Sequence, residues 1–241
     1  MSKNTIKIAN CSGFYGDRLS AAKEMVDGGP IDVLTGDYLA ELTMAILYGQ
    51  KIQRGEKAGY VGTFLKQLKQ IASSCSEKNI KVVSNAGGLN PKSMAEEVKN
   101  ILDSEGLNLK VAYIDGDDFM DKFDELKKNG EELKNLDTGV SLFKQSLPAV
   151  SANYYLGCWG IKQALDEGAD IVICPRVTDA ALVMGPAAWK FNWSRDDYDK
   201  LAGSLAAGHI IECGAQATGG NYSFFKDCLL YTSPSPRDTS S

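Results

Sequence analysis

Short apolar runs that end in glycine, aspartate or asparagine and lead into helical patterns recur along most of this chain. This alternation restricts the fold more than any other feature of the sequence. The expected strands are 6–9, 31–34, 80–83, 109–114 and 171–174. Strands that alternate with helices predict βαβ units. We therefore expect an α/β fold with a mainly parallel sheet and helices on both faces, a Rossmann-like layered arrangement.

The expected helices differ in how clearly their buried face can be predicted. One helix near 18–26 follows the first strand, and a second runs up to about Tyr48. In the second, Leu39, Leu42 and Ile46 recur at three- and four-residue spacing, which predicts that this face is buried. Further helices are expected at 63–74 and from Pro91 to about 102, because proline suits the first turn of a helix. The charged stretch 122–144 is expected to be exposed, as a linker or as a cover over the site.

Composition excludes several classes of protein. The net charge is −5, from 26 basic and 31 acidic residues, which is not typical of a nucleic-acid-binding protein. No stretch approaches the ~20 apolar residues of a membrane span, and the first residues resemble no targeting signal. We therefore expect a cytoplasmic protein that binds neither nucleic acid nor membrane.

The chain has six cysteines without a C-x-x-C motif and a single histidine, His209. Three-histidine metal sites are thus excluded, and we expect no metal site.

The last fourteen residues, CLLYTSPSPRDTSS at 228–241, differ from everything before them. As natural sequence they would form a disordered Ser/Pro tail. The run CLLYTSPSPRD also resembles the in-frame translation of a transposase sequencing adapter. We interpret 228–241 as a non-native, disordered tail. Residues 1–227 are then expected to form one α/β domain that is incomplete at its C-terminal end.

Ligands of open parallel sheets bind beyond the carboxyl ends of the strands. All five expected strands end in polar or glycine-rich turns. Two features resemble half of a dinucleotide-binding site. They are the turn Asn85-Ala86-Gly87-Gly88 after the third strand and Asp115 at the end of the next strand. The alternative is a tight strand-to-helix turn. Near the first strand, Asp17 is expected to cap the next helix. Arg18 either is solvated or clamps an anion.

Two later segments also carry candidate chemistry. Arg176 and Asp179 either pair with each other or bind and orient a substrate, and Thr178 or Asp179 could cap the following helix. On a helix, His209, Glu212 and Cys213 would share one face, which permits a metal site or a cysteine nucleophile. The flanking glycines favour a loop or short strand instead, in which Glu212 faces away from its neighbours.

Several motifs together resemble one family. They are GFYGDR at 13–18, LTGDYLAELTM at 34–44, NAGGLNP at 85–91, YYLG at 154–157, RVTDAALVMGPA at 176–187 and GHIIECGAQATGGN at 208–221. As a set, and in this order, they resemble the N-terminal domain of the acyclic terpene utilization (AtuA-like) family. Pro175 departs from the pattern, where glycine is expected before Arg-Val-Thr-Asp. The resemblance implies a role in the catabolism of acyclic terpenoids through acyl-CoA intermediates, with no assigned reaction.

We expect a catabolic protein that acts on small branched acyl or acyl-CoA compounds. The alternatives are a non-catalytic subunit or scaffold of an acyl-CoA carboxylase-type complex, and a nucleotide-dependent enzyme. No cofactor can be named, and the expected partners are a small-molecule substrate and either a second copy or an enzyme complex. The expected catalytic residues are Asp37, Asp179, His209 and Glu212. The expected substrate-binding residues are Arg18, Asn85, Gly87, Gly88, Arg176, Thr178, Gln216 and Asn221.

Overall fold

The computed structural model describes residues 5–145 and 149–214. It contains one five-stranded, all-parallel sheet in the order β1-β2-β3-β5-β4. The strands are β1 (Ile8–Asn10), β2 (Val33–Gly36), β3 (Lys81–Ser84), β4 (Val111–Tyr113) and β5 (Ile171–Ile173). Each predicted strand is present, with its ends shifted by at most two residues. The predicted α/β fold with a parallel sheet is confirmed.

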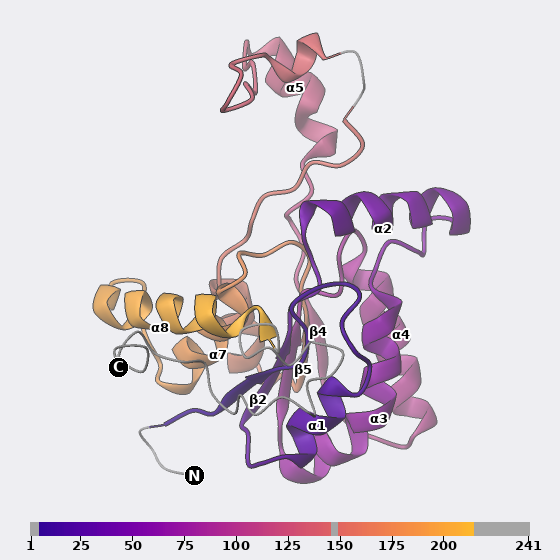
Figure 1. The fold of residues 1–241 in the computed structure, drawn as a ribbon, viewed down its shortest axis with the longest axis vertical. Helices are drawn as coiled ribbons and strands as arrows, with labels where there is room; N and C mark the ends of the chain where they lie inside the picture. Colours follow the sequence, from indigo (N-terminus) through magenta and orange to yellow (C-terminus); the bar gives the residue numbers. More distant parts are fainter. Residues whose placement is uncertain (1–4, 146–148, 215–241) are drawn as a thin grey trace, which may run out of the picture.

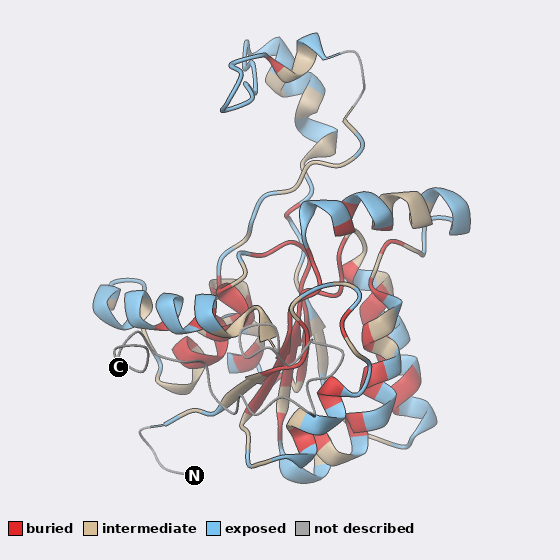
Figure 2. Cartoon of the chain, in the orientation of Figure 1, coloured by how far each residue is buried: buried red, intermediate tan, exposed pale blue. Residues whose placement is uncertain are grey.

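Helices cover both faces of this sheet (Figure 1). They are α1 (Ala21–Asp27), α2 (Glu41–Arg54), α3 (Gly62–Lys78), α4 (Pro91–Ser104), α5 (Phe123–Lys128), α6 (Trp159–Asp166), α7 (Ala181–Lys190) and α8 (Tyr198–Ile211), with short 3₁₀ turns η1 (Met120–Lys122) and η2 (Leu142–Lys144). Successive strand residues point to opposite faces. In β3, Val82 packs with α1, α3 and α4, whereas Val83 packs with α6 and α7. Burial on both faces (Figure 2) explains why the strands are continuous apolar runs.

The order of the strands places a switch point between β3 and β5. The chain steps through β1, β2 and β3, crosses to β4, and then returns to insert β5 between β3 and β4. The helices that follow β3 and β5 therefore cover opposite faces: α4 packs in one hydrophobic core and α7 in the other. The turns after these strands separate there, and ligands of open α/β sheets bind at such a point.

Helix α2 corrects one prediction. Its buried residues are Thr43, Met44 and Leu47, whereas Leu42 is 73% and Ile46 39% exposed. The helix begins just beyond the carboxyl end of β2 and lies at that edge of the molecule (Figure 2), not flat on a face of the sheet. Leu39, which precedes the helix, is buried, whereas Leu42 and Ile46 face outward. The prediction of a buried face was therefore right for Leu39 and wrong for the two residues within the helix.

The charged stretch 122–144 is exposed, as predicted, and projects from the body of the protein with α5 (Figure 1). Its two ends are held together at its base. Asp118 and Asn153 form an antiparallel bridge, and the rings of Phe119 and Tyr154 stack with centroids 4.4 Å apart. The segment is thus an excursion from the sheet edge that returns to it, rather than a linker between two sheets.

The described residues contain no candidate membrane span and no disulfide bond. No helix in 5–145 or 149–214 has the length and apolar character needed to cross a membrane. The five cysteines in these ranges are free, and all except Cys213 are buried.

Helix α8 corrects a second prediction, because it continues through Gly208 to Ile211 where a loop or short strand was expected. Gly208 does not break the helix; it permits close packing against the start of α7. A Cβ atom built on Gly208 would lie 2.9 Å from the Cβ and 3.0 Å from the Cα of Ala180. This close approach fixes the end of α8, from which Glu212 follows directly.

We expect Gly208→Ala to destabilise the protein by about 1–3 kcal/mol, because the added methyl group meets the backbone of Ala180. Gly203 lies in the same helix with open space around its Cα, so Gly203→Ala is the matched control. It should stabilise the fold by up to about 1 kcal/mol through helix propensity alone. Urea unfolding of both variants measures the difference. Equal effects would show that α8 does not pack closely at Gly208.

Candidate functional site

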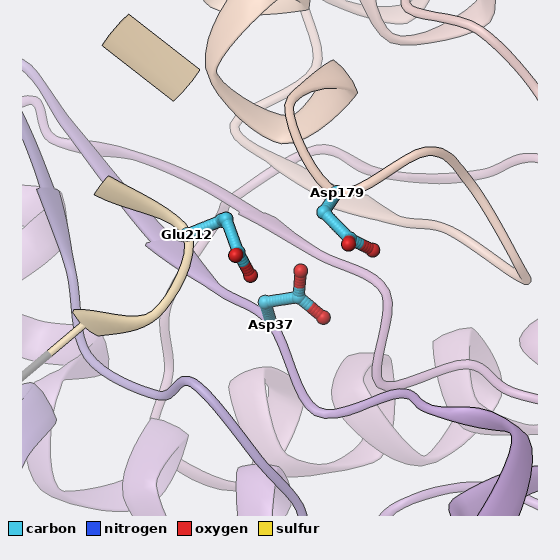
Figure 3. Close-up of side chains that lie close together, drawn as sticks. All are labelled: Asp37, Asp179 and Glu212. Carbon is cyan, nitrogen blue, oxygen red and sulfur yellow. The ribbon is translucent and has the colours of Figure 1, made fainter. Parts of the chain in front are cut away.

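Three carboxylates from distant parts of the chain meet at the carboxyl edge of the sheet. Asp37 follows β2, Asp179 follows β5 just before α7, and Glu212 directly follows α8. One oxygen from each lies within 4.8 Å of the others. Figure 3 shows the three side chains gathered around one small space. The fold thus brings together three of the four predicted catalytic residues.

Asp37 is the most buried member of this carboxylate cluster, with 3% exposure. Its Oδ1 accepts hydrogen bonds from Asn85 Nδ2 at 2.6 Å and from Leu39 N at 3.3 Å. Asn85 Oδ1 in turn accepts from Tyr38 N at 2.8 Å. Asp37 Oδ2 has no hydrogen-bond partner among the described residues, although it is buried. Asn85 therefore positions Asp37, while one carboxylate oxygen remains available.

Burial raises the pKa of Asp37 from 3.8 to about 7, and the charge of Asp179 acts in the same direction. The hydrogen bond from Asn85 and the charge of Arg176 oppose this rise without cancelling it. Desolvation disfavours the charged form of a carboxyl group, and a neighbouring carboxylate adds repulsion. Asp37 is thus held in an environment that does not compensate its negative charge.

Arg176 pairs with the cluster through Asp179 and is only 5% exposed. Its Nη1 lies 3.2 Å from Asp179 Oδ1 and also donates to the carbonyl oxygen of Leu39 at 3.3 Å. The backbone N–H of Arg176 donates to Asp117 Oδ2 at 3.2 Å. The predicted pairing of Arg176 with Asp179 is present. The guanidinium is oriented by the protein from several sides.

Tyr155 and Glu41 form the outer side of Arg176. The guanidinium carbon lies 4.3 Å from the centroid of the Tyr155 ring, a cation–π arrangement. The Tyr155 hydroxyl donates to Glu41 Oε1, and this hydrogen bond lowers the pKa of Glu41. Glu41 Oε1 is 3.9 Å from Arg176 Nη2. Tyr155 is half exposed, so the aromatic ring separates the buried guanidinium from solvent.

Glu212 is held by its neighbours at the end of α8. Asn10 Nδ2, at the end of β1, donates to the carbonyl oxygens of Ile211 and Glu212 at 3.1 and 2.7 Å. Cys213 Sγ donates to Glu212 Oε1 at 3.0 Å, and this bond together with burial raises the pKa of Cys213 to about 11. The thiol stays protonated at neutral pH, so the structure does not favour the cysteine-nucleophile alternative.

The glycine turn after β3 offers no amides to a ligand. Gly87 N donates to the carbonyl oxygen of Cys174, and Gly88 N donates to that of Asn85. Both glycines are buried, and a Cβ on Gly87 would lie 2.5 Å from the Cys174 oxygen. The glycines permit close packing of two strand ends. Asp115, the acidic residue of the dinucleotide-like pattern, is exposed beyond β4, the edge strand that β5 separates from β3.

Asp17 and Arg18 lie outside the carboxylate cluster. Asp17 accepts hydrogen bonds from Gly13 N at 3.0 Å and Arg18 N at 2.9 Å. Asp17 therefore closes the loop after β1. The prediction that it caps α1 was wrong, because this helix begins only at Ala21. The Arg18 guanidinium pairs with Glu24 on the surface at 2.6 Å.

The other predicted site residues are also separate from the cluster. Thr178 is exposed, and neither it nor Asp179 caps α7 through its side chain. His209 is exposed in the last turn of α8 and is not part of the cluster. The substrate-binding predictions for Gln216 and Asn221 lie outside the described residues.

Sequence reasoning missed three residues that shape the site: Asn10, Asp117 and Tyr155. Asp117 lies in the polar sequence Asp115-Gly116-Asp117-Asp118 after the fourth expected strand, and Tyr155 lies in the YYLG motif, but the sequence assigned neither a role. Asn10 ends the first strand, but nothing in the sequence pairs it with position 212. Only the tertiary structure shows that β1 and α8 end side by side.

Comparison with known proteins supports the family expected from the motifs. Residues 6–235 match the model of the acyclic terpene utilisation family protein AtuA. No curated protein and no solved structure matches the chain. The match spans almost the whole sequence and includes every element that contributes to the carboxylate cluster. The chain therefore belongs to the AtuA family of acyclic terpene utilisation proteins.

Proposed function

We propose that this protein is an enzyme of acyclic terpene utilisation that acts on the carbonyl end of a small branched acyl compound, free or as a CoA thioester. The observation that carries this proposal is the carboxylate cluster. The buried Asp37 carboxylate, whose Oδ2 accepts no hydrogen bond from the described residues, lies beside two further carboxylates, and this arrangement costs stability. Such a cost is tolerated at sites where charged groups perform chemistry.

Exposed apolar side chains in the segments that adjoin the site support a branched hydrocarbon substrate. Phe14 is 44%, Leu42 73% and Tyr155 50% exposed. Phe14 follows Gly13, which lies against the carbonyl group of Cys213, and Leu42 follows Glu41, which is bonded to Tyr155. Exposed apolar side chains thus occur in the segments that also carry residues of the polar site. An acyl chain with a polar head and an apolar body matches that distribution.

The two alternatives receive less support. A non-catalytic scaffold has no need for a buried carboxylate at the carboxyl edge of the sheet. A nucleotide-dependent enzyme needs backbone amides aimed at phosphate. Here the amides of the turn after β3 donate to carbonyl oxygens within the protein.

Ligand-dependent thermal shift of the full chain tests the proposal. A branched ten-carbon acyl-CoA or its free acid should raise Tm by about 5–10 °C at a hundredfold excess over Kd. A straight-chain acyl-CoA of equal length should shift Tm less, and CoA alone tests recognition of the carrier. Asp179→Asn should abolish turnover of the branched acyl compound. If no acyl compound changes Tm, the proposal is wrong, and stable co-purification with a carboxylase-type enzyme would support the scaffold instead.

A further inference from the structure

The geometry of the carboxylate cluster is compatible with a bound cation. Hard divalent cations bind oxygen ligands at about 2.0–2.6 Å, so oxygens on one cation lie about 3–5 Å apart. The oxygens of Asp37, Asp179 and Glu212 are within 4.8 Å of one another. These separations match those of three ligand oxygens on one ion.

Each carboxylate of the cluster is oriented through one oxygen. The donors to these oxygens are Asn85 Nδ2 on Asp37 Oδ1, Arg176 Nη1 on Asp179 Oδ1 and Cys213 Sγ on Glu212 Oε1. The second oxygen of each group receives no hydrogen bond from residues in the described ranges. Metal-binding carboxylates are commonly held in this way, with outer hydrogen bonds fixing the ligand and one oxygen facing the ion.

The charges of the cluster are also uncompensated. Three carboxylates face one guanidinium, that of Arg176, which pairs with Asp179. The buried Oδ2 of Asp37, on a side chain that is 3% exposed, has no partner in the part of the chain described. Buried charges in proteins are paired or coordinate metals. A missing positive charge at this oxygen is the second observation that points to a cation.

We propose that Asp37, Asp179 and Glu212 bind one hard divalent cation of the Mg²⁺ or Mn²⁺ type. Carboxylate oxygens without histidine or thiolate ligands select such ions. Because Asp179 and Glu212 are half-buried, the remaining coordination positions can hold water or a substrate oxygen. This inference goes beyond the proposed function, since it does not depend on the substrate. It replaces the expectation from sequence that the chain has no metal site.

Binding of Mn²⁺ to the chelator-treated full chain tests the site directly. The electron paramagnetic resonance signal of free Mn²⁺ should fall until one ion per chain is bound, and excess Mg²⁺ should restore the signal. Asp37→Asn and Glu212→Gln should each raise Kd for Mn²⁺ about tenfold or more. Glu212 is half-buried at the end of a helix, so its variant remains informative if Asp37→Asn fails to fold.

Two control variants distinguish the cluster from general attraction by acidic residues. Glu41→Gln removes a carboxylate that is close to Arg176 but outside the cluster, and Asp166→Asn removes one from an exposed ion pair on α6. Both should bind Mn²⁺ as the unaltered chain does. Absence of saturable binding at millimolar Mn²⁺, or equal weakening in all four variants, would overturn the proposal. Because no acyl ligand is present, this result is independent of the substrate test.

Discussion

Asp37→Asn is expected to stabilise the cation-free protein at pH 8. The folded-state pKa of Asp37 is raised from 3.8 to about 7, so the folded protein binds a proton that the unfolded chain has already lost. Stability therefore falls as pH rises from about 4 to about 7 and is constant above that range. The rise in pKa corresponds to a loss of about 4 kcal/mol as an upper limit. Asparagine cannot ionise and avoids this loss.

Urea unfolding of both proteins between pH 4 and pH 8, with a chelator present, measures this effect. The two curves of stability against pH should coincide near pH 4 and separate above pH 5, with the variant the more stable. The asparagine can keep the Oδ1 contact with Asn85, and its amide group replaces the unpartnered Oδ2. Asp166→Asn, at an exposed ion pair, should show no such separation. A variant less stable at pH 8 would mean that the Asp37 carboxylate is compensated in the folded protein.

The position of the site could be predicted from the sequence, because parallel strands must end at one edge and polar turns follow them. Asp37 and Asp179 each come within six residues of a strand end, and both were named on that basis. Arg176 and Asn85 were identified by the same reasoning. In the structure Asn85 is fully buried and positions Asp37, and Arg176 pairs with Asp179, as one of the two sequence alternatives predicted, and is also held by the carbonyl oxygen of Leu39.

The other features of the site and fold depend on packing between residues far apart in the sequence, which local sequence patterns do not reveal. Glu212 joins Asp37 only because α8 continues past Gly208 and ends against Asn10, whereas its flanking glycines predicted a loop. Similarly, spacing alone identifies the apolar stripe of α2 but not which side faces the core. The exposed Leu42 and Ile46 follow from the placement of this helix at the sheet edge.

Because three carboxylates face the single guanidinium of Arg176, substitution of this residue is expected to have a large effect on stability. Arg176→Met removes a cation that is 5% exposed and leaves the carboxylates without a counter-charge, at a cost of about 3–5 kcal/mol. Lys23→Met breaks an exposed lysine–carboxylate pair, with Asp27, and should have little effect on stability. Urea unfolding at pH 8 in the presence of a chelator compares the two variants.

A double-mutant cycle then shows whether this cost arises from the carboxylate cluster. If repulsion among Asp37, Asp179 and Glu212 causes it, adding Asp37→Asn to Arg176→Met should recover a substantial part of the lost stability. If the loss instead reflects the contacts of Arg176 with Leu39 and Tyr155, Asp37→Asn should stabilise both backgrounds equally. Added Mn²⁺ should likewise stabilise Arg176→Met more than the unaltered protein, because the ion supplies the positive charge that the substitution removed.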